Sequence, residues 1–573
     1  MLSDVIQIFK KKYKDQGDQI ITDAYTPADG EYIIIDTNQD KFHILDKVYI
    51  KQDKKTREVD SSNPHFDFIC KADYMSRYLE SNKAISDKNI HSNNYLTFFV
   101  KKENIHNGKI TNEVIEKYYD ILKNPLIKYT KSKSKKLYES LEKKYGKPNK
   151  AQVERIEDWI KNNIFNLIDP DSKDKSYLKI FFKFDLAIYK NESERYILAN
   201  IYNSTDYNET IDNKIYGLPN DNMGLNSKKP YLENKSRKAT VPYLISEEEV
   251  LIQKKFFDYL ANQAALNKTN IYIGANQIES YKNDETPEED FCGYYLRIKK
   301  GKEIEIHDFD TIGLYEAQIS PLSLENTLQL EKPKLEYSTI HKLSTLKNII
   351  NDVFFNKCLT TNYFTDAKDI RIHDSALKRN LLISRTTLFT WFYKGNDSNA
   401  WKILKQSSLD LIKGSIYKGY LTKAGEQFNL RCGLKKYFEG GDNMADILVD
   451  VKDTLRAKIT NKSGTETIAS DTEYYFAVGQ LTSYFISLSK TKTKMHSLAN
   501  PMINAKTNEK IKEELRKLYK KYNYTINTAT NRFNNLFAMV SSYVPEGKIM
   551  EDLIIAGYLH SNLLYEKSDK GGK

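Results

Sequence analysis

Short apolar runs separated by polar turns dominate the start of the chain. Residues 31–36 and 41–50 are rich in isoleucine and flank an Asn-Gln-Asp turn. Two such runs joined by a short polar turn predict a β-hairpin. Residues 96–100 form a further apolar run with two phenylalanines, which predicts a third strand.

The middle of the chain carries two more predicted strand pairs. Residues 177–186 and 195–202 are apolar and aromatic and predict one pair. Residues 294–298 and 303–307 predict a second pair, which turns at Gly301. Strands and helices do not alternate in the βαβ rhythm of a nucleotide-binding fold, so we expect antiparallel sheets.

Helical patterns occupy two other parts of the chain. Residues 112–165 are helical in pattern and highly charged, with a run of lysines and serines at 131–136. Beyond about Leu322 the strand patterns disappear. We therefore expect the second half of the chain to be built of helices.

Apolar residues at helical spacing mark four helices in the last quarter. Ser470 and Glu473 predict a capping box at the start of the first. The short connections predict an antiparallel bundle, with Arg516, Lys517 and Lys520 opposite the apolar stripe of the second helix. The apolar positions are Tyr474, Val478, Leu481, Phe485 and Leu488, then Ile511, Leu515, Leu518 and Tyr522, then Phe533, Leu536, Phe537 and Val540, and finally Leu553, Ile554, Gly557 and Leu564.

These patterns predict an α+β protein: antiparallel sheets with helices in its N-terminal and central regions, followed by a C-terminal all-α helical bundle. At 573 residues the chain is long enough for several domains. The predicted parts are an N-terminal α+β region at 1–110, a charged helical insertion at 111–175, a central β-rich region with a basic turn at 176–321, a helical connector at 322–440 and the bundle at 441–573.

The composition also indicates the cellular compartment. The four cysteines, Cys70, Cys292, Cys358 and Cys432, lie far apart and form no C-x-x-C pair, so neither a zinc ribbon nor a disulfide framework is predicted. The start of the chain lacks the apolar stretch of a signal peptide, and no segment has the roughly 20 apolar residues that span a bilayer. We expect a cytoplasmic protein without membrane contact.

Positive charge is concentrated near the C-terminus. Residues 490–532 contain nine lysines and two arginines against three glutamates, a formal charge of +8, whereas the whole chain carries +11. A local positive field of this kind suits a polyphosphate such as a nucleic acid. A solvated helix face and loop would have the same composition.

Recognisable catalytic motifs are missing from the sequence, which has no P-loop, dinucleotide fingerprint, nucleophile elbow or H-E-x-x-H. His307, Asp308 and Asp310 could in principle hold a catalytic metal of a nuclease, as could the pair His373 and Asp374. We favour a strand end entering an Asp-rich turn at His307. No enzyme activity, cofactor or bound metal is expected.

Three blocks, in order, resemble the large subunit of subtype I-B CRISPR-Cas surveillance complexes (Cascade) of the clostridial type. The first is residues 82–101, and the second is residues 216–237 with Gly217, Gly224 and Pro230 as turn residues. The third consists of residues 476–480, 494–501, 532–536 and 555–559. Many relatives carry paired cysteines in the central region, whereas residues 201–232 contain none, so a zinc site is not carried over.

The resemblance implies a non-catalytic DNA-recognition subunit. In such complexes a guide RNA supplies sequence specificity, and protein inspects the short adjacent motif (PAM) and holds the opened strands, as in other RNA-guided effectors. The implied partners are the guide CRISPR RNA, target double-stranded DNA and its displaced strand, the backbone, guide-handle and small subunits, and a separate helicase-nuclease.

Candidate nucleic-acid-binding residues follow from the blocks and from the charge pattern. Cations in a turn can meet duplex phosphates, asparagines can read base edges, and cations on the bundle can track a displaced strand. For the asparagines, turn capping is the competing interpretation. The candidates are Asn93 and Asn94; Lys228, Lys229, Asn234, Lys235, Arg237 and Lys238 in the central turn; and Lys490, Lys492, Lys494, Arg516, Lys517 and Lys520 in the bundle.

Two alternatives stay open from the sequence, a metal-dependent nuclease and a general basic RNA-binding scaffold. A further hypothesis concerns Met444, which follows Glu439, Gly440 and Gly441 directly before the bundle. The codons of these residues can spell a ribosome-binding sequence, so the bundle could also be made as a separate small subunit. An interdomain linker would have the same residues.

Overall fold

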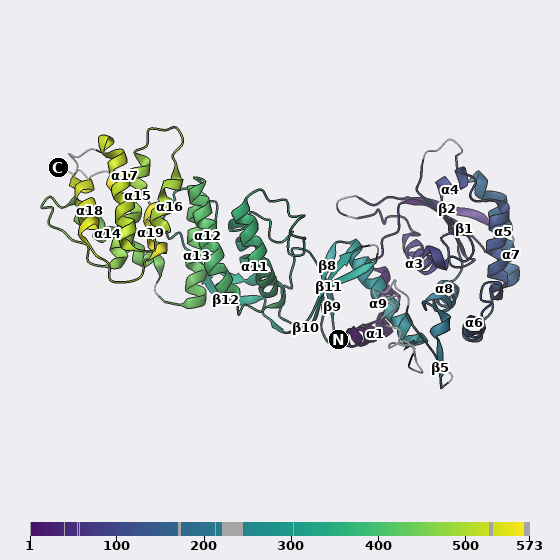
Figure 1. Cartoon of the computed structure of the whole chain (residues 1–573). Coiled ribbons are helices and arrows are strands. Elements are labelled where there is room, and N and C mark those ends of the chain that lie inside the picture. The colour runs from purple at the N-terminus through teal and green to yellow at the C-terminus, as the bar shows by residue number, and fades with distance from the viewer. Residues whose placement is uncertain are drawn as a thin grey trace. The chain divides into compact units, whose positions relative to one another are not determined.

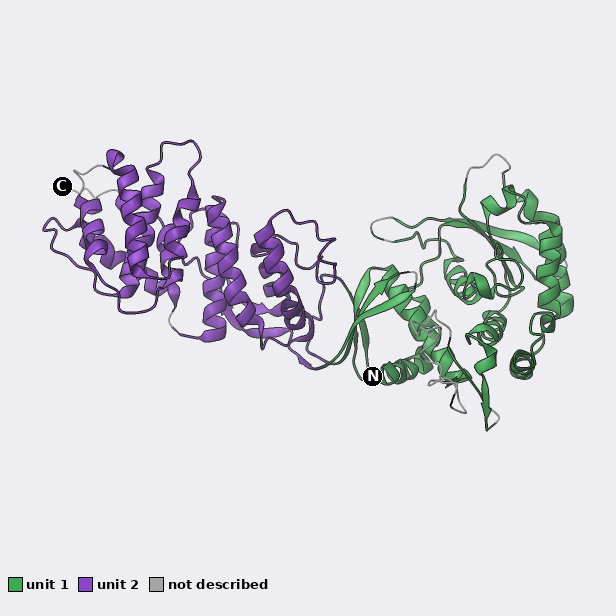
Figure 2. Cartoon of the chain, viewed as in Figure 1, with its two compact units in different colours: residues 1–282, 293–311 green, residues 283–292, 312–573 purple. Residues whose placement is uncertain are grey.

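The computed structural model describes residues 2–38, 41–53, 56, 58–169, 174–212, 214–219, 236, 244–301, 303–441, 443–526 and 531–566. The chain forms two compact units (Figure 2), residues 1–282 with 293–311 and residues 283–292 with 312–573. Helices and strands occur in both units, and the α+β prediction is confirmed. Among the described helices, none is both long and apolar enough to cross a bilayer.

A four-stranded sheet organises the first unit (Figure 1). It contains β1 (Gly30–Asp36), β2 (His43–Ile50), β3 (Thr97–Lys101) and β4 (Tyr177–Phe182), in the order β2-β1-β4-β3. The hairpin of β1 and β2 and the third strand β3 were predicted and are confirmed. The expectation of antiparallel sheets is wrong at one pair, because β1 and β4 run parallel. A parallel pair needs a long crossover, and here more than a hundred residues separate the two strands.

The predicted strand at 195–202 is wrong, because this segment belongs to helix α8 (Leu186–Asn200). Asp185 caps the helix, its side chain accepting a hydrogen bond from the Ala187 amide at 2.8 Å. Most of the second half of α8 is buried, and Glu192 pairs with Arg195 inside the protein. A helix buried on most sides has no polar face, so its period is hidden in the sequence.

The remaining helices of this unit surround the sheet. The predicted charged helices at 112–165 are α5 (Asn112–Lys123), α6 (Ser132–Tyr145) and α7 (Lys150–Asn163), and their buried residues belong to the same core as the sheet. They are therefore part of the first unit and not a separate body. The others are α1 (Leu2–Gln16), α2 (Gln19–Thr22), α3 (Phe66–Ser76), α4 (Lys102–His106) and α9 (Glu247–Ala265).

Two smaller sheets complete the strands before residue 315. The predicted pairing across Gly301 is confirmed in the sheet β11-β10-β8-β9. Its strands are β8 (Lys268–Ile273), β9 (Ile278–Lys282), β10 (Phe291–Lys300) and β11 (Ile304–Tyr315). The second sheet has β5 (Glu209–Ile211), β6 (Lys214–Gly217) and β7 (Ile245–Ser246).

The second unit is mostly helical. Strands were not expected beyond Leu322, but β12 (Gln318–Ser323) pairs with the later strand β13 (Thr339–Lys342). Four helices follow before the glycine pair Gly440 and Gly441. They are α10 (Leu343–Val353), α11 (Ser375–Lys394), α12 (Ala400–Tyr417) and α13 (Leu421–Glu439).

The C-terminal helices share one core that also takes in side chains of α12 and α13. The predicted second helix is α17 (Asn508–Tyr522), and its buried residues are the four predicted ones, Ile511, Leu515, Leu518 and Tyr522. The predicted first helix, α15 (Asp471–Ser487), is buried on nearly all sides and not along one stripe. It lies in the interior of the bundle. The others are α14 (Met444–Thr460), α16 (Asn500–Ile503), α18 (Asn531–Ser542) and α19 (Glu551–Leu559).

Candidate nucleic-acid interface

The loop after α15 presents two of its three predicted lysines to solvent. Lys490 and Lys492 are exposed. Lys494 instead turns back to the end of α15, where its ammonium group donates to the carbonyl oxygens of Ser487, at 2.9 Å, and Ser489. A lysine that satisfies the last carbonyl groups of a helix supports the fold. Lys494 thus has a structural role, contrary to the prediction.

Helix α17 carries the predicted cations on its solvent side, since Arg516, Lys517 and Lys520 are all exposed. They are not equivalent. The Lys517 ammonium lies 2.8 Å from a carboxylate oxygen of Glu513 and 2.9 Å from one of Glu514. These two acids neutralise Lys517 locally, which the charge count along the sequence could not show. Arg516 and Lys520 form no ion pair within the part of the chain that the structure describes.

An exposed aromatic ring stands beside these cations. Tyr524 lies in the short 3-10 helix Asn523–Thr525 that follows α17, and it is 68% exposed. The Lys490 ammonium lies 5.5 Å from the centre of its ring, so the loop and the helix end meet here. Arg516 and Lys520 are four residues apart and lie on one side of α17, and Tyr524 lies just beyond the end of this helix. We name Lys490, Arg516, Lys520 and Tyr524 the Tyr524 surface.

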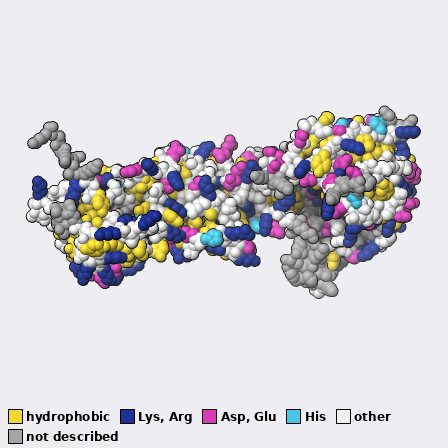
Figure 3. All heavy atoms as spheres, turned by 90° about the horizontal axis from the view of Figure 1, so that it is seen from above, with side chains coloured by type: hydrophobic (Ala, Val, Ile, Leu, Met, Phe, Trp, Pro, Cys, Tyr) yellow, Lys and Arg dark blue, Asp and Glu magenta, His cyan; other side chains and the backbone are white. Residues whose placement is uncertain are grey.

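The chemistry of the Tyr524 surface suits a single strand. Cations can contact successive phosphates while an exposed ring offers a stacking face to a base, without any sequence preference. Figure 3 shows further groups of Lys and Arg side chains among hydrophobic ones at the end of the second unit that carries α14 to α19. Sequence reasoning found the cations but missed Tyr524.

The histidine of the loop motif is structural. The His496 Nδ1 atom lies 2.7 Å from the Tyr558 hydroxyl on α19. Burial lowers the pKa of His496, and Lys494 adds to the effect, so the ring is neutral near pH 7. The contact fixes the loop against the bundle and thereby positions Lys490 and Lys492.

The prediction that Asn93 and Asn94 read base edges is wrong. Asn93 is 2% exposed, and its side chain donates to the carbonyl oxygens of Met75 and Arg77, each at 2.9 Å. Asn94 is fully buried, donates to the Ser76 hydroxyl at 3.1 Å and accepts from the Leu96 amide at 2.9 Å. Their amides hold the turn between α3 and β3, so the capping interpretation is confirmed.

The central basic turn lies outside the described residues. This applies to all six of its candidates, Lys228, Lys229, Asn234, Lys235, Arg237 and Lys238. The structure describes its flanks, which are strands β6 and β7 of the small three-stranded sheet. At the first flank the Gly217 backbone lies so close to the Tyr202 ring that a side chain there would collide with it.

The nuclease residues do not converge within the described structure. His307 does not end a strand, as was expected, because β11 continues to Tyr315. Successive side chains of a strand point to opposite faces, which separates His307 from Asp308 and Asp310. In the second pair, Asp374 caps α11 by accepting from the amides of Ala376 and Leu377. Within the described residues, no group of three or more His, Cys, Asp or Glu side chains could hold a metal.

Sequence reasoning also missed a set of buried cations in the first unit. Lys179 lies in the middle of the apolar strand β4, and Lys254 and Lys255 interrupt an apolar run of α9. All three are buried. Buried lysines are rare unless they are paired, so a lysine inside an apolar run is the signal that could have pointed to them.

In comparisons with known proteins, no protein-family model, curated protein or solved structure matches the chain.

Proposed function

We propose that the chain is the non-catalytic large subunit of a type I-B CRISPR RNA-guided surveillance complex. In this role it binds the guide RNA together with the backbone, guide-handle and small subunits in the cytoplasm. It inspects the PAM on target double-stranded DNA, stabilises the displaced strand and helps to recruit a separate helicase-nuclease. Sequence specificity then resides in base pairing, and the protein supplies contacts to backbone and shape.

The observation that carries this proposal is the Tyr524 surface. Its cations and exposed ring are what a displaced strand of any sequence requires. Its residues lie between stretches of the third block that resembles Cascade large subunits, residues 476–480, 494–501, 532–536 and 555–559. The central turn, with Lys228, Lys229 and Arg237, is proposed to contact the phosphates beside the PAM.

The test is to purify the tagged chain with its bound partners from cells that make it naturally. We expect repeat-derived guide RNA and guide-binding subunits to copurify. Filter binding is then measured with duplexes that all contain the guide-matched target and differ only in the flanking bases. Tight binding to a subset of flanks supports PAM recognition. Absence of repeat-derived RNA, together with equal binding to all flanks, would leave only a general basic scaffold.

An enzyme assay tests the remaining alternative, a metal-dependent nuclease. The purified chain is incubated with single- and double-stranded DNA and divalent metal ions, with and without a chelator. The proposal expects no chelator-sensitive cleavage. Cleavage that disappears in a His307→Ala variant would instead establish the nuclease.

A further inference from the structure

A cavity of about 790 Å³ opens within the first unit, far along the sequence from the Tyr524 surface. Ligand pockets for small molecules typically have volumes of ~300–1,000 Å³. Its walls come from the segment after α3, from β4, from α9 and from the turn after β10. The proposed function makes no use of it.

Four cations line one side of the cavity. Lys179 pairs with Asp73 at 2.6 Å, and Lys255 pairs with Asp18. Arg77 and Lys254 share a single acid, Asp258: Arg77 Nη2 lies 3.4 Å from one carboxylate oxygen, and Lys254 binds the other. Two cations thus share one carboxylate at this side of the cavity, while Lys300, Glu80 and Glu303 line other parts of it. An anionic group of a ligand beside Arg77 would meet a cation whose one ion pair in the described residues spans 3.4 Å.

Arg77 is the cation with bonding capacity to spare. Its guanidinium lies 5.5 Å and 5.4 Å from the ring centres of Tyr25 and Tyr74, which hold it in place. It makes one side-chain hydrogen bond within the described residues, although a guanidinium has five N–H donors. Its side chain lines the cavity and is 40% accessible. Such a fork suits two oxygens of one phosphate.

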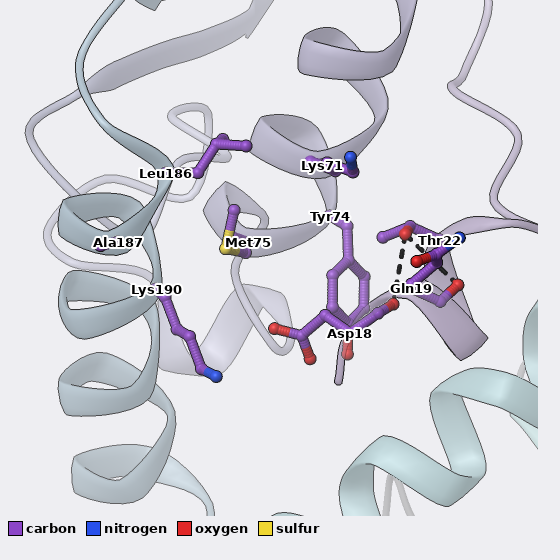
Figure 4. Close-up of a pocket in the computed structure, with 9 residues that line it drawn as sticks. All are labelled: Asp18, Gln19, Thr22, Lys71, Tyr74, Met75, Leu186, Ala187 and Lys190. Atoms are coloured by element: carbon purple, nitrogen blue, oxygen red, sulfur yellow. Dashed lines mark hydrogen bonds between the residues drawn. The ribbon is translucent and has the colours of Figure 1, made fainter. Parts of the chain in front are cut away.

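Tyr74 lines the larger cavity in a fixed position. Its hydroxyl donates to Asp258 at 2.9 Å, and its ring also lines a smaller cavity of about 220 Å³. Figure 4 shows this smaller cavity, where the Lys190 side chain of α8 extends toward Asp18. Burial alone would raise the pKa of Asp18, but Lys255 and Lys190 keep it below its usual value, so the carboxylate stays ionised.

Three aromatic rings form another part of the cavity wall. The ring centre of His91 lies 5.1 Å from that of Tyr78 and 5.4 Å from that of Tyr177. Burial lowers the pKa of His91 to about 4, helped by Lys101 and Lys179, so the imidazole is neutral. Neither its ring nitrogens nor the Tyr78 hydroxyl has a hydrogen-bond partner within the described residues. A neutral imidazole can donate one hydrogen bond and accept another, as the edge of a base requires.

We infer that this cavity binds a nucleotide, with its phosphate on Arg77 and its base against Tyr78, His91 and Tyr177. The size of the cavity, the spare donors of Arg77 and the aromatic wall each suit one part of that ligand. The inference does not depend on the proposed function. The nucleotide could be free, or it could be one unit of a single strand.

Calorimetric titration of the full chain tests the inference with three probes: a nucleoside 5′-monophosphate, the same nucleoside without phosphate, and inorganic phosphate. We expect the monophosphate to bind at least tenfold more tightly than either part. All four common bases are tried. If no monophosphate binds at millimolar concentration, or if inorganic phosphate binds equally well, the inference is wrong.

Variants locate the binding. Arg77→Ala removes the phosphate contact and Tyr78→Leu removes part of the aromatic wall, and each is expected to weaken binding at least tenfold. Tyr78 is half-buried, so its variant serves if Arg77→Ala does not fold. The matched control is Lys109→Ala, an exposed cation of the same unit outside the cavity. Affinity that survives both cavity variants would place the nucleotide elsewhere and overturn the assignment.

Competition separates the two sources of nucleotide. A short single-stranded RNA with a 5′-phosphate is titrated against the bound monophosphate. If the strand displaces the monophosphate and Tyr78→Leu weakens both, the ligand is a unit of a strand. If the strand does not compete, the cavity takes a free nucleotide.

Discussion

Gly479 of α15 and Gly557 of α19 lie directly against each other. A Cβ atom on Gly479 would lie 2.8 Å from the carbonyl carbon of Gly557 and would collide with the carbonyl oxygen of Ile554. A Cβ atom on Gly557 would lie 2.9 Å from the carbonyl carbon of Phe476. The neighbouring Gln480 side chain fixes the crossing, donating to the Gly557 carbonyl at 2.6 Å and accepting from the Leu563 amide at 2.8 Å.

Gly479→Ala and Gly557→Ala should therefore each destabilise the second unit. The added methyl group meets backbone atoms, which cannot rotate away, so we expect a loss of about 2–3 kcal/mol in the free energy of unfolding. Urea denaturation followed by circular dichroism measures it. The control is Gly414→Ala in α12, where a Cβ would meet only Ala376 at 3.8 Å. The interpretation fails if all three variants are equally stable.

These two glycines show what the sequence could and could not give. Both lie in blocks that carry the resemblance, but only the folded structure shows that they let α15 and α19 cross closely. Helix α17 was predictable residue by residue because one of its faces meets water. Helix α15 was predicted as a helix but with one apolar stripe only, whereas it is buried on nearly all sides. Part of α8 was predicted as a strand, because burial on most sides removes the polar face that reveals a helical period.

Residue type was an equally incomplete guide to the candidate interface. The Asn93 amide has the chemistry to read a base edge, but in the fold it donates to two backbone carbonyls. Lys517 counts as positive in the sequence, but two glutamates one helical turn away offset it. Tyr524 and the cavity around Arg77 depend on contacts between distant segments, which no local pattern encodes.

The difference between paired and unpaired cations gives a second prediction. Arg516→Glu with Lys520→Glu should lower the yield of open R-loops in the assembled complex, because both cations are exposed and carry no ion pair in the described structure. Permanganate reactivity of displaced thymines measures that yield. Lys517→Gln should have a smaller effect, since its charge is already offset. An equal loss of open R-loops in the Arg516→Glu, Lys520→Glu variant and in the Lys517→Gln variant would contradict the distinction between paired and unpaired cations.

Fold stability is the control for those charge changes. All three positions lie opposite the buried stripe of α17. Surface substitutions of this kind usually change stability by less than ~0.5 kcal/mol. Thermal unfolding of each variant checks this. Short-lived binding to PAM duplexes should persist, because the central turn is unchanged.

The exposed ring gives a third prediction. Tyr524→Ala should weaken binding of a single-stranded oligonucleotide by about 1–3 kcal/mol, the usual contribution of one stacked base. Tyr524→Phe keeps the ring and should bind like the natural protein. Tyr417→Ala, which removes another exposed tyrosine of the second unit, is the matched control. Fluorescence anisotropy with a labelled strand measures all of them, and a Tyr524→Phe variant as weak as Tyr524→Ala would argue against stacking.

Acid should destabilise the second unit through His560. This residue is 5% exposed and lies against Phe476, and burial together with Lys452 lowers the pKa of His560 from 6.5 to about 4. Between these two values the unfolded chain binds a proton that the folded chain does not. Stability is therefore complete above pH 6.5 and falls as the pH drops toward 4, by about 3 kcal/mol at most.

The measurement is urea denaturation at several pH values between 4 and 7. His560→Gln should flatten the dependence, although Arg456 and Glu566 also act on this site and remain. Exposed His106 in the first unit provides the control, because His106→Gln should leave the slope of the second unit unchanged. An identical slope in His560→Gln would assign the acid sensitivity to other groups.

The last prediction concerns a separate product that begins at Met444. Met444 is the first residue of α14, and the Asn443 side chain caps that helix by accepting from the Ala445 amide at 3.2 Å. Gly440 and Gly441 before it both have positive φ, with no atom near enough to meet a side chain, as in a linker. A chain starting here would keep helices α14 to α19 and most of their shared core.

Such a product would also lose some neighbours. The shared core includes Ile412, Ile416 and Phe428 of α12 and α13, and Arg431 of α13 pairs with Asp552 of α19 at 3.1 Å. A fragment of residues 444–573 should therefore be stable only when another subunit covers this face, as the small subunits along a guide would require. Alone it should unfold at a lower temperature than the second unit does in the full chain. A fragment equally stable alone would show that α12 and α13 are not needed.

Synonymous recoding of Glu439, Gly440 and Gly441 tests whether the internal start is used. The large subunit stays chemically identical, so only translation from Met444 is affected. We expect a small product beginning at Met444 to vanish from the purified native complex by mass spectrometry, and interference to drop. A second gene that supplies residues 444–573 should restore it. If no such product exists before recoding, the glycine pair is a linker alone, and the small subunits come from another gene.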